Sequence, residues 1–375
     1  MGTASTMACI AEALGMTVPG GASPPAVTAD RIRIAEETGR QAVEMARKGL
    51  TIDKVLTPAA FENALRVLLA IGGSTNGIVH LTAIAGRMGI DIDLLGLDRM
   101  GEETPVLLDL KPSGQHYMED FHKAGGMATL LRELKPLLRL EAMTVTGRTL
   151  GEEIERAGDG FAQDVIRSFN DPIYPQGGLA VLHGNLAPGG AIIKQSAADA
   201  KLMEHEGRAV VFENSADLAN RIDSDDLDVN AEDILVLKNI GPKGAPGMPE
   251  AGYIPIPRKL ARAGVKDIVR ISDGRMSGTA FGTIVLHVTP EAAIGGPLAY
   301  VQNGDRIRLS VKNREIALLV SEEELARRAK QSPVVEPTAD RGYRKLFLQT
   351  VTQADQGVDF DFLQAVNKVG KAPEK

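Results

Sequence analysis

The pattern of apolar residues changes near Pro172, and this change constrains the fold more than any other feature of the sequence. Before it, apolar residues recur at spacings of three and four, the period of helices with one buried face. After it, short β-rich runs alternate with Gly and Pro, which is typical of strands. The chain has 375 residues, enough for two domains. We therefore expect an α/β chain with residues 1–171 in one domain and residues 172–375 in a β-rich second domain.

Helices are expected where this spacing coincides with capping residues. One half-buried helix is predicted over residues 30–50, and a second begins at Thr57 and Pro58, which suit the N-cap and the first helical position. The buried stripe of the first is expected to be Ala35, Thr38, Ala42 and Met45. Thr149 and Glu152 form a capping box that begins a further helix.

The segment GGSTNG, residues 72–77, joins the second helix to a third over residues 78–87. Its backbone donors and short polar side chains suit an anion or a hydroxylated ligand. The same residues can also do no more than cap the ends of the two helices.

Strands are expected in the β-rich part of the chain. The predicted strands are residues 208–213, 233–238, 267–271 and 283–288. Two further runs, 306–311 and 315–320, flank the tripeptide KNR and predict a hairpin. The segment DFDFLQAV, residues 359–366, is expected to close the chain as a short helix or tail.

Two loops of the β-rich part carry candidate chemistry. GPKGAPGMPEAG, residues 241–252, holds one carboxylate, Glu250, which suits Mg²⁺ because this ion takes oxygen ligands and few protein carboxylates. Ser277 follows Arg275 in SDGRMSG; to act as a base it must ionise, which requires a strong local positive field. The alternative for both residues is an ordinary turn position. A nucleophile elbow is absent, since Arg275 stands where its first Gly is needed.

Composition excludes several classes of function. The 49 acidic and 42 basic residues give a net charge of -7, without a Lys/Arg block that could follow a phosphate backbone, so no nucleic-acid partner is expected. No apolar run approaches the ~18 residues of a membrane span. The single cysteine, Cys9, is expected in the core, and the cytoplasm is the expected location. His80, His183 and His287 lack metal-ligand spacing and are expected to be structural.

Four segments together resemble one family. In chain order they are GTASTMACIAEALGM, GGSTNGIVHLTAIAGRMGIDIDL, GPKGAPGMPEAG and SDGRMSGTAFGTIVLHVTPEA. They are similar to the dihydroxyacid and sugar-acid dehydratases, a family that includes phosphogluconate dehydratase. RMSGTAFGTIVLHV and VTQADQGVDFDFL look most like the aldonate branch, the arabinonate and xylonate dehydratases.

The resemblance implies a hydro-lyase that removes water from a 2,3-dihydroxy sugar acid to give a 2-keto-3-deoxy acid. Its implied cofactors are Mg²⁺ and an iron–sulfur cluster, with 2Fe–2S expected in preference to 4Fe–4S. Carried over to this sequence, Ser277 is the catalytic base, Glu250 is a Mg²⁺ ligand and Thr279 binds substrate. The implied second domain is barrel-like, and a homo-oligomer, dimer or tetramer, is expected.

The resemblance also contains a departure. The family's cluster cysteines, its other Mg²⁺ carboxylates and a carbamylated lysine precede the GTAS segment, whereas this sequence begins at Met1. We therefore expect an N-terminally truncated member with an incomplete first domain, no cluster ligand of its own and no activity alone. The alternative is a non-catalytic fragment or partner subunit.

Overall fold

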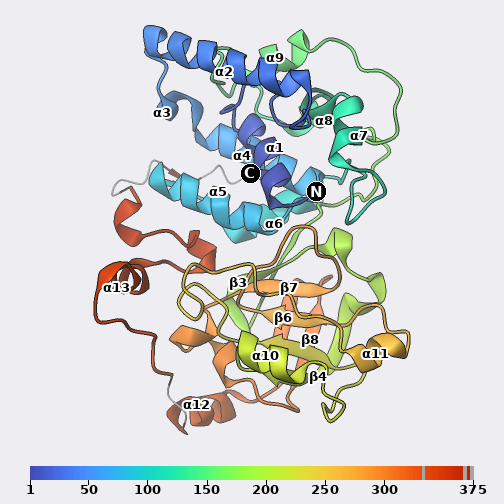
Figure 1. Ribbon diagram of the computed structural model, residues 1–375, viewed down its shortest axis with the longest axis vertical. Coiled ribbons are helices and arrows are strands. Elements are labelled where there is room, and N and C mark those ends of the chain that lie inside the picture. The colour runs from blue at the N-terminus through green and yellow to red at the C-terminus, as the bar shows by residue number, and fades with distance from the viewer. Residues whose placement is uncertain (332–333, 366–369, 372–375) are drawn as a thin grey trace. The chain divides into compact units, whose positions relative to one another are not determined.

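The computed structural model describes residues 1–331, 334–365 and 370–371, and the chain divides into two units (Figure 1). Unit 1 comprises Met1–Leu179 and Ala365–Lys375, and unit 2 comprises Ala180–Gln364. The two units are described separately. Among the described residues, no helix combines the length and the apolar character that crossing a membrane requires.

Unit 1 is built mainly from helices. They are α1 (Thr3–Ala13), α2 (Ala29–Lys48), α3 (Ile52–Val55), α4 (Pro58–Ala70), α5 (Asn76–Arg87), α6 (Leu94–Glu103), α7 (Met118–Lys123), α8 (Gly126–Leu134) and α9 (Leu150–Arg156). Two short strands, β1 (Ile90–Asp91) and β10 (Gly370–Lys371), pair in parallel. The α/β character expected for residues 1–171 is therefore slight in the described part of this unit.

Helix α4 forms as predicted and lies in the core of unit 1. The Thr57 hydroxyl accepts a hydrogen bond from the Ala60 N–H at 3.4 Å, and Pro58 occupies the first turn. Every residue from Ala60 to Ala70 is buried. The Thr149–Glu152 capping box of α9 is confirmed as well, while α5 begins at Asn76, two residues before the predicted start.

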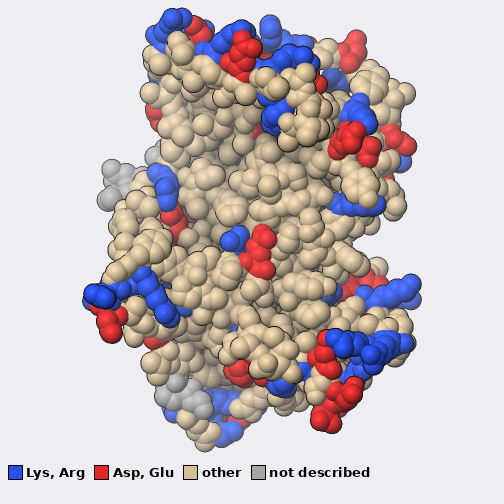
Figure 2. All heavy atoms as spheres, in the orientation of Figure 1, with Lys and Arg blue, Asp and Glu red and all other residues tan. Residues whose placement is uncertain are grey.

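Helix α2 also forms over the predicted segment, but its predicted burial is wrong. None of its residues is buried; Ala35, Thr38 and Ala42 are exposed and Met45 is half-buried. Ion pairs along the helix, such as Arg33–Asp30 and Arg47–Glu44, suit a solvated surface. On the face drawn in Figure 2, basic and acidic side chains lie next to each other along this helix. The three-and-four spacing thus predicted the helix correctly, but it did not predict whether other parts of the chain would cover its apolar face.

Unit 2 is a closed barrel, which confirms the barrel-like domain that the resemblance implied. Its strands are β2 (Ala180–Gly184), β3 (Ala187–Ile193), β4 (Glu204–Phe212), β5 (Ile234–Leu237), β6 (Arg270–Ser272), β7 (Ile284–Thr289), β8 (Arg306–Ser310) and β9 (Glu315–Leu318). They follow the order β2-β3-β7-β6-β5-β4-β8-β9 around the barrel. All the predicted strands overlap these elements, and β8 and β9 pair as the predicted hairpin.

The interior of the barrel is apolar because alternate residues of each strand point inward. The inward residues include Ile193, Val236, Ile271 and Val285. The described part of unit 2 also contains four α-helices that were not predicted. They are α10 (Ser215–Arg221), α11 (Arg258–Arg262), α12 (Glu322–Gln331) and α13 (Gly342–Thr350). At the end of the chain, Asp361–Leu363 forms one 3-10 turn, while Val366 of the predicted closing segment lies outside the described residues.

Candidate functional site

The two loops that carry the candidate residues follow neighbouring parallel strands of the barrel. Strand β5 leads into residues 239–252, and strand β6 leads into residues 273–283. The last residues of the two strands, Leu237 and Ser272, lie side by side in register. Loops at the carboxyl ends of adjacent parallel strands are common places for ligand sites.

Two buried carboxylates hold the base of the β5 loop. Asp273 accepts hydrogen bonds from the backbone N–H groups of Asn239 at 3.2 Å and Ile240 at 2.9 Å, and a third from Ala292 at 2.9 Å. Burial is the largest cause that raises the pKa of Asp273, to about 6, with Glu291 nearby as a smaller one. This carboxylate therefore ties the start of the β5 loop to the start of the β6 segment.

Glu291 makes the second set of contacts. Its carboxylate accepts the backbone N–H groups of Lys243 and Gly244 at 2.9 Å, and the Gln353 amide at 2.8 Å. Asp273 and Glu291 were not among the predicted site residues. The available signal was a carboxylate one or two residues after a buried strand, at SDG and at TPEA.

Beyond this base, the two loops are hydrogen-bonded to each other. The Gly252 N–H donates to the Arg275 carbonyl at 2.8 Å, and the Arg275 guanidinium donates to the Met248 carbonyl. A Cβ at Gly252 would lie 3.0 Å from that Arg275 oxygen, so a larger residue would have to push the two loops slightly apart. Glu250 and Ser277 are each two residues from this junction, so the structure brings their segments together.

The environments of the candidate side chains differ. Ser277 is half-buried, and its hydroxyl lies 2.9 Å from that of Thr279, which is exposed. Glu250 is exposed near the end of its loop. Met276 and Ala280 on either side of Ser277 pack against outward-facing residues of β7, and this apolar contact holds the serine segment on the barrel.

The residues that the structure describes do not complete a metal centre. Among them, no three His, Cys, Asp or Glu side chains gather in a way that could hold an ion. Cys9 is fully buried in α1, and burial raises the pKa of its thiol to about 12, which disfavours the thiolate that iron requires. Glu250 remains the one predicted Mg²⁺ ligand on these loops.

The GGSTNG segment of unit 1 is held by helix α1. The Ser74 hydroxyl lies 2.9 Å from that of Thr3, the Asn76 amide donates to the Thr3 hydroxyl at 3.0 Å, and the Ser74 N–H donates to Thr6 at 3.1 Å. These contacts fix the segment against α1, whereas the side chain of Thr75 does not cap the start of α5.

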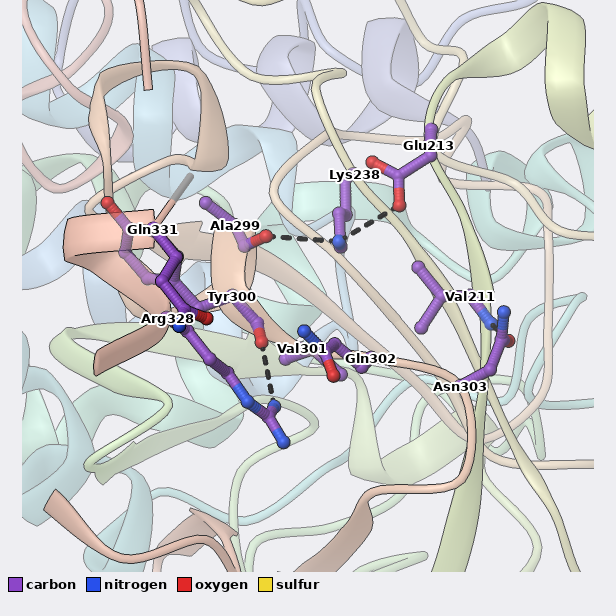
Figure 3. Close-up of a pocket in the computed structure, with 10 residues that line it drawn as sticks. All are labelled: Val211, Glu213, Lys238, Ala299, Tyr300, Val301, Gln302, Asn303, Arg328 and Gln331. Atoms are coloured by element: carbon purple, nitrogen blue, oxygen red, sulfur yellow. Dashed lines mark hydrogen bonds and ion pairs between the residues drawn. The ribbon is translucent and has the colours of Figure 1, made fainter. Parts of the chain in front are cut away.

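A separate hollow of about 400 Å³ lies beside the carboxyl ends of β4 and β5 (Figure 3). Its charged side chains are paired: Lys238 donates to Glu213 at 3.1 Å and to the Ala299 carbonyl at 3.0 Å, while Arg328 donates to the Tyr300 carbonyl at 3.0 Å. Ser277, Thr279 and Glu250 are not among its lining residues. The hollow is therefore distinct from the paired loops.

The protein is therefore a β-barrel protein whose candidate site is formed by two joined loops. One loop carries a serine and the other a carboxylate. Comparison with known proteins makes this specific. The N-terminal dihydroxy-acid/6-phosphogluconate dehydratase model matches residues 1–153, and the C-terminal model of the same name matches residues 164–358. The chain belongs to the dihydroxy-acid/6-phosphogluconate dehydratase family.

Several relatives align with nearly all of the chain. It is 49% identical to the L-arabonate dehydratase of Azospirillum brasilense, over 95% of this chain and 62% of the relative. It is 48% identical to the L-arabinonate dehydratase of Rhizobium leguminosarum bv. trifolii, over 96% and 63%. A dihydroxy-acid dehydratase of Methanothrix thermoacetophila is 42% identical, over 95% and 65%. The chain thus spans less than two thirds of the length of each.

Proposed function

We propose that this chain carries the base and one metal-ligand loop of a dehydratase that converts a 2,3-dihydroxy sugar acid into a 2-keto-3-deoxy acid. The observation that carries the proposal is the hydrogen-bonded junction of the two loops, which places the Ser277 and Glu250 segments next to each other. Membership of a dehydratase family supports the reaction type.

In the proposed reaction, the Ser277 oxygen removes the proton from C2 of the substrate. The C–H electron pair forms the C2–C3 double bond while the C3–O bond breaks, and the departing hydroxyl leaves as water after taking up a proton. The resulting enol becomes the 2-keto acid when C3 gains a proton and the C2 hydroxyl loses one. The Thr279 hydroxyl, 2.9 Å from the base, is suited to hold the substrate or to orient the serine oxygen.

The family resemblance implies Mg²⁺ and an iron–sulfur cluster, with 2Fe–2S expected. Glu250 fits a Mg²⁺ ligand in chemistry and position, since it is an exposed oxygen donor beside the serine loop. The described residues alone do not complete either centre. We propose that the chain alone does not turn over substrate.

The proposed substrate class is the aldonates. Its support is that the relatives at 48% and 49% identity are named for arabinonate or arabonate, whereas the dihydroxy-acid dehydratase of Methanothrix thermoacetophila stands at 42%. When an aldonate and 2,3-dihydroxyisovalerate compete for the active enzyme, we expect the aldonate to have the higher kcat/KM. Preference for the branched acid would contradict this assignment.

The function is tested by measuring 2-keto acid formation from aldonates in two samples. One is the purified chain after reconstitution with iron, sulfide and Mg²⁺; the other is the chain extended by the upstream segment that the resemblance implies. We expect product only from the extended form. Product from neither would favour the non-catalytic fragment or partner subunit, and product from the chain alone would overturn its proposed inactivity. Cytoplasmic location and a homo-oligomeric state remain predictions.

A further inference from the structure

The inference begins at Met248 in the β5 loop, where the backbone is an outlier. Its φ is 44°, in the left-handed region that few residues other than glycine adopt. The next residue is Pro249, and a proline normally restricts the residue before it to extended backbone. Met248 is also only 1% exposed, so this is not a loose surface turn. Such a conformation persists only where surrounding contacts impose it, and it is found most often at functional sites.

The contacts of Met248 show what imposes this conformation. Within the loop, the Met248 N–H donates to the Ala245 carbonyl at 2.7 Å. From the β6 segment, the Arg275 guanidinium donates to the Met248 carbonyl through Nε. The first contact is local, whereas the second comes from a residue 27 positions away in the sequence. Arg275 is therefore a side chain of the neighbouring segment that holds the outlier in place.

The backbone of Arg275 makes a second contact with the same loop. Its carbonyl accepts the Gly252 N–H at 2.8 Å. The residue before it, Gly274, packs so closely that an added Cβ would lie 3.3 Å from the Gly252 Cα and 2.7 Å from a methyl carbon of Ile240. The side chain and the main chain of Arg275 thus hold the β5 loop at two points, residues 248 and 252.

These two points lie on either side of Glu250, each two residues from it, and Ser277 lies two residues beyond Arg275. One residue therefore ties the backbone on both sides of the proposed Mg²⁺ ligand to the segment of the proposed base. Contacts that orient a ligating carboxylate matter to function, because their loss typically lowers metal affinity or activity by about 10–100-fold.

We propose that Arg275 is a positioning residue. Its guanidinium holds the β5 loop in the strained conformation at Met248 and thereby fixes the backbone around Glu250 relative to the Ser277 segment. The inference rests on the proposed function, because Glu250 and Ser277 take their roles from it. The contact between the loops can nevertheless be measured on the purified chain, without substrate, metal or cluster.

The first test is amide hydrogen exchange of the purified chain, followed by NMR. In Arg275→Gln, we expect the Gly252 N–H to exchange at least about tenfold faster than in the parent, because the two loops separate more often without the guanidinium. The Ile240 N–H, which donates to Asp273 at the base of the same loop at 2.9 Å, should keep its rate. Arg262→Gln, which changes an exposed arginine of α11, is the control and should alter neither amide.

A second substitution tests the strain at Met248. Glycine adopts a positive φ without penalty, so Met248→Gly should allow the loop to keep its conformation when the guanidinium is absent. Met248→Ala removes the same buried side chain but still disfavours a positive φ. Combined with Arg275→Gln, the glycine variant should therefore exchange the Gly252 N–H roughly threefold more slowly than the alanine variant. This difference separates backbone strain from lost packing.

Activity of the enzyme extended by the upstream segment gives a further measurement. Arg275→Gln should raise the Mg²⁺ concentration for half-maximal activity by about tenfold, with a smaller change in the KM for the aldonate. Arg275→Lys keeps a donor at this position and should show a smaller rise in the Mg²⁺ requirement. A higher KM with an unchanged Mg²⁺ requirement would overturn the inference, because it would assign the guanidinium to the substrate.

Two results of the exchange experiment would also overturn the inference. One is an unchanged Gly252 exchange rate in Arg275→Gln, and the other is equal exchange in the glycine and alanine double variants. The proposed function fails by a different result, namely full turnover by Ser277→Ala, which the exchange rates do not report. The two failures are therefore distinguishable.

Discussion

The loops after β5 and β6 are neighbours on one barrel, but they are held in opposite ways. The β5 loop is fixed at its base through backbone N–H groups that donate to the buried carboxylates of Asp273 and Glu291, while Glu250 farther along is exposed. The β6 segment is fixed through apolar side chains, and Ser277 between them is half-buried.

This difference matches what each proposed role requires. A cation ligand must be reachable from solvent, and an exposed carboxylate on a fixed loop base meets that requirement. A base is more effective where water is limited and a fixed charge lies near, because electrostatic interactions are stronger there. The comparison predicts that substitutions in the two loops will have different consequences for activity, metal dependence and stability.

The largest effect is expected from Ser277→Ala in the active enzyme. Loss of a general base should lower kcat by at least ~10²–10⁴-fold and leave KM nearly unchanged, because the base acts only as the C2 proton leaves. Steady-state kinetics measure both constants. Ser168→Ala, an exposed serine of unit 1, is the control and should be normal. A near-normal kcat for Ser277→Ala would show that Ser277 is not the base and would favour the alternative of an ordinary turn serine.

Glu250→Gln should cost less, about tenfold or more in activity at low Mg²⁺. The amide is a weaker ligand than the carboxylate, so added Mg²⁺ should recover part of the activity. Titration of the rate with Mg²⁺ measures this, with the exposed Glu322→Gln as control. Equal rescue of Ser277→Ala by Mg²⁺ would remove the distinction between the two loops.

Asp273→Asn tests the base of the β5 loop. In the variant, the side-chain NH₂ group would point at one of the backbone N–H groups that donate to the carboxylate in the parent. That N–H group would lose its acceptor, so we expect a loss of about 1–3 kcal/mol in the free energy of unfolding. Denaturant unfolding measures it, and the exposed Asp225→Asn should show no comparable loss. A variant as stable as the parent would show that these three hydrogen bonds do not hold the loop.

The same carboxylate predicts a pH dependence of stability. Burial raises the pKa of Asp273 from 3.8 to about 6. Between these values the unfolded chain has lost a proton that the folded chain retains, so the contribution of this group to stability falls as the pH rises from about 4 to about 6. The free energy of unfolding, measured across this pH range, should fall in the parent and fall less in Asp273→Asn. The same slope against pH in both proteins would contradict this prediction.

The smallest effect is expected from Gly252→Ala, which places a methyl group 3.0 Å from the Arg275 oxygen. Backbone must shift by a few tenths of an ångström, so we expect a modest loss of thermal stability and a weaker junction between the loops. Gly39→Ala in helix α2 is the control: nothing lies within 4 Å of the added methyl, and alanine favours a helix. Equal gains in melting temperature for both variants would contradict a tight junction.

Local sequence signals were sufficient where the chain itself supplied the interaction. The Thr57 and Thr149 caps and the β8–β9 hairpin depend on residues only a few positions apart. The same signals could not show that the helix over Ala29–Lys48 would have no buried face, because burial depends on neighbours that are distant in sequence. Glu291 and Lys243 are likewise joined only after the barrel has formed.

For the candidate site, the motifs indicated Ser277, Thr279 and Glu250, whose roles remain proposals. The supporting residues were not predicted: the carboxylates at SDG and TPEA could be read from the sequence, but not the backbone N–H groups of the β5 loop that Asp273 and Glu291 accept.

The central claim, removal of the C2 proton by a base of this chain, is tested most directly with an aldonate deuterated at C2. The active enzyme is incubated with it in ordinary water, and deuterium in the 2-keto-3-deoxy product is measured by NMR. Proton abstraction followed by loss of the C3 hydroxyl predicts a product in which the hydrogen newly added to C3 comes mainly from water. Complete transfer of the deuterium from C2 to C3 would indicate a direct hydride shift that needs no base, and would contradict the account.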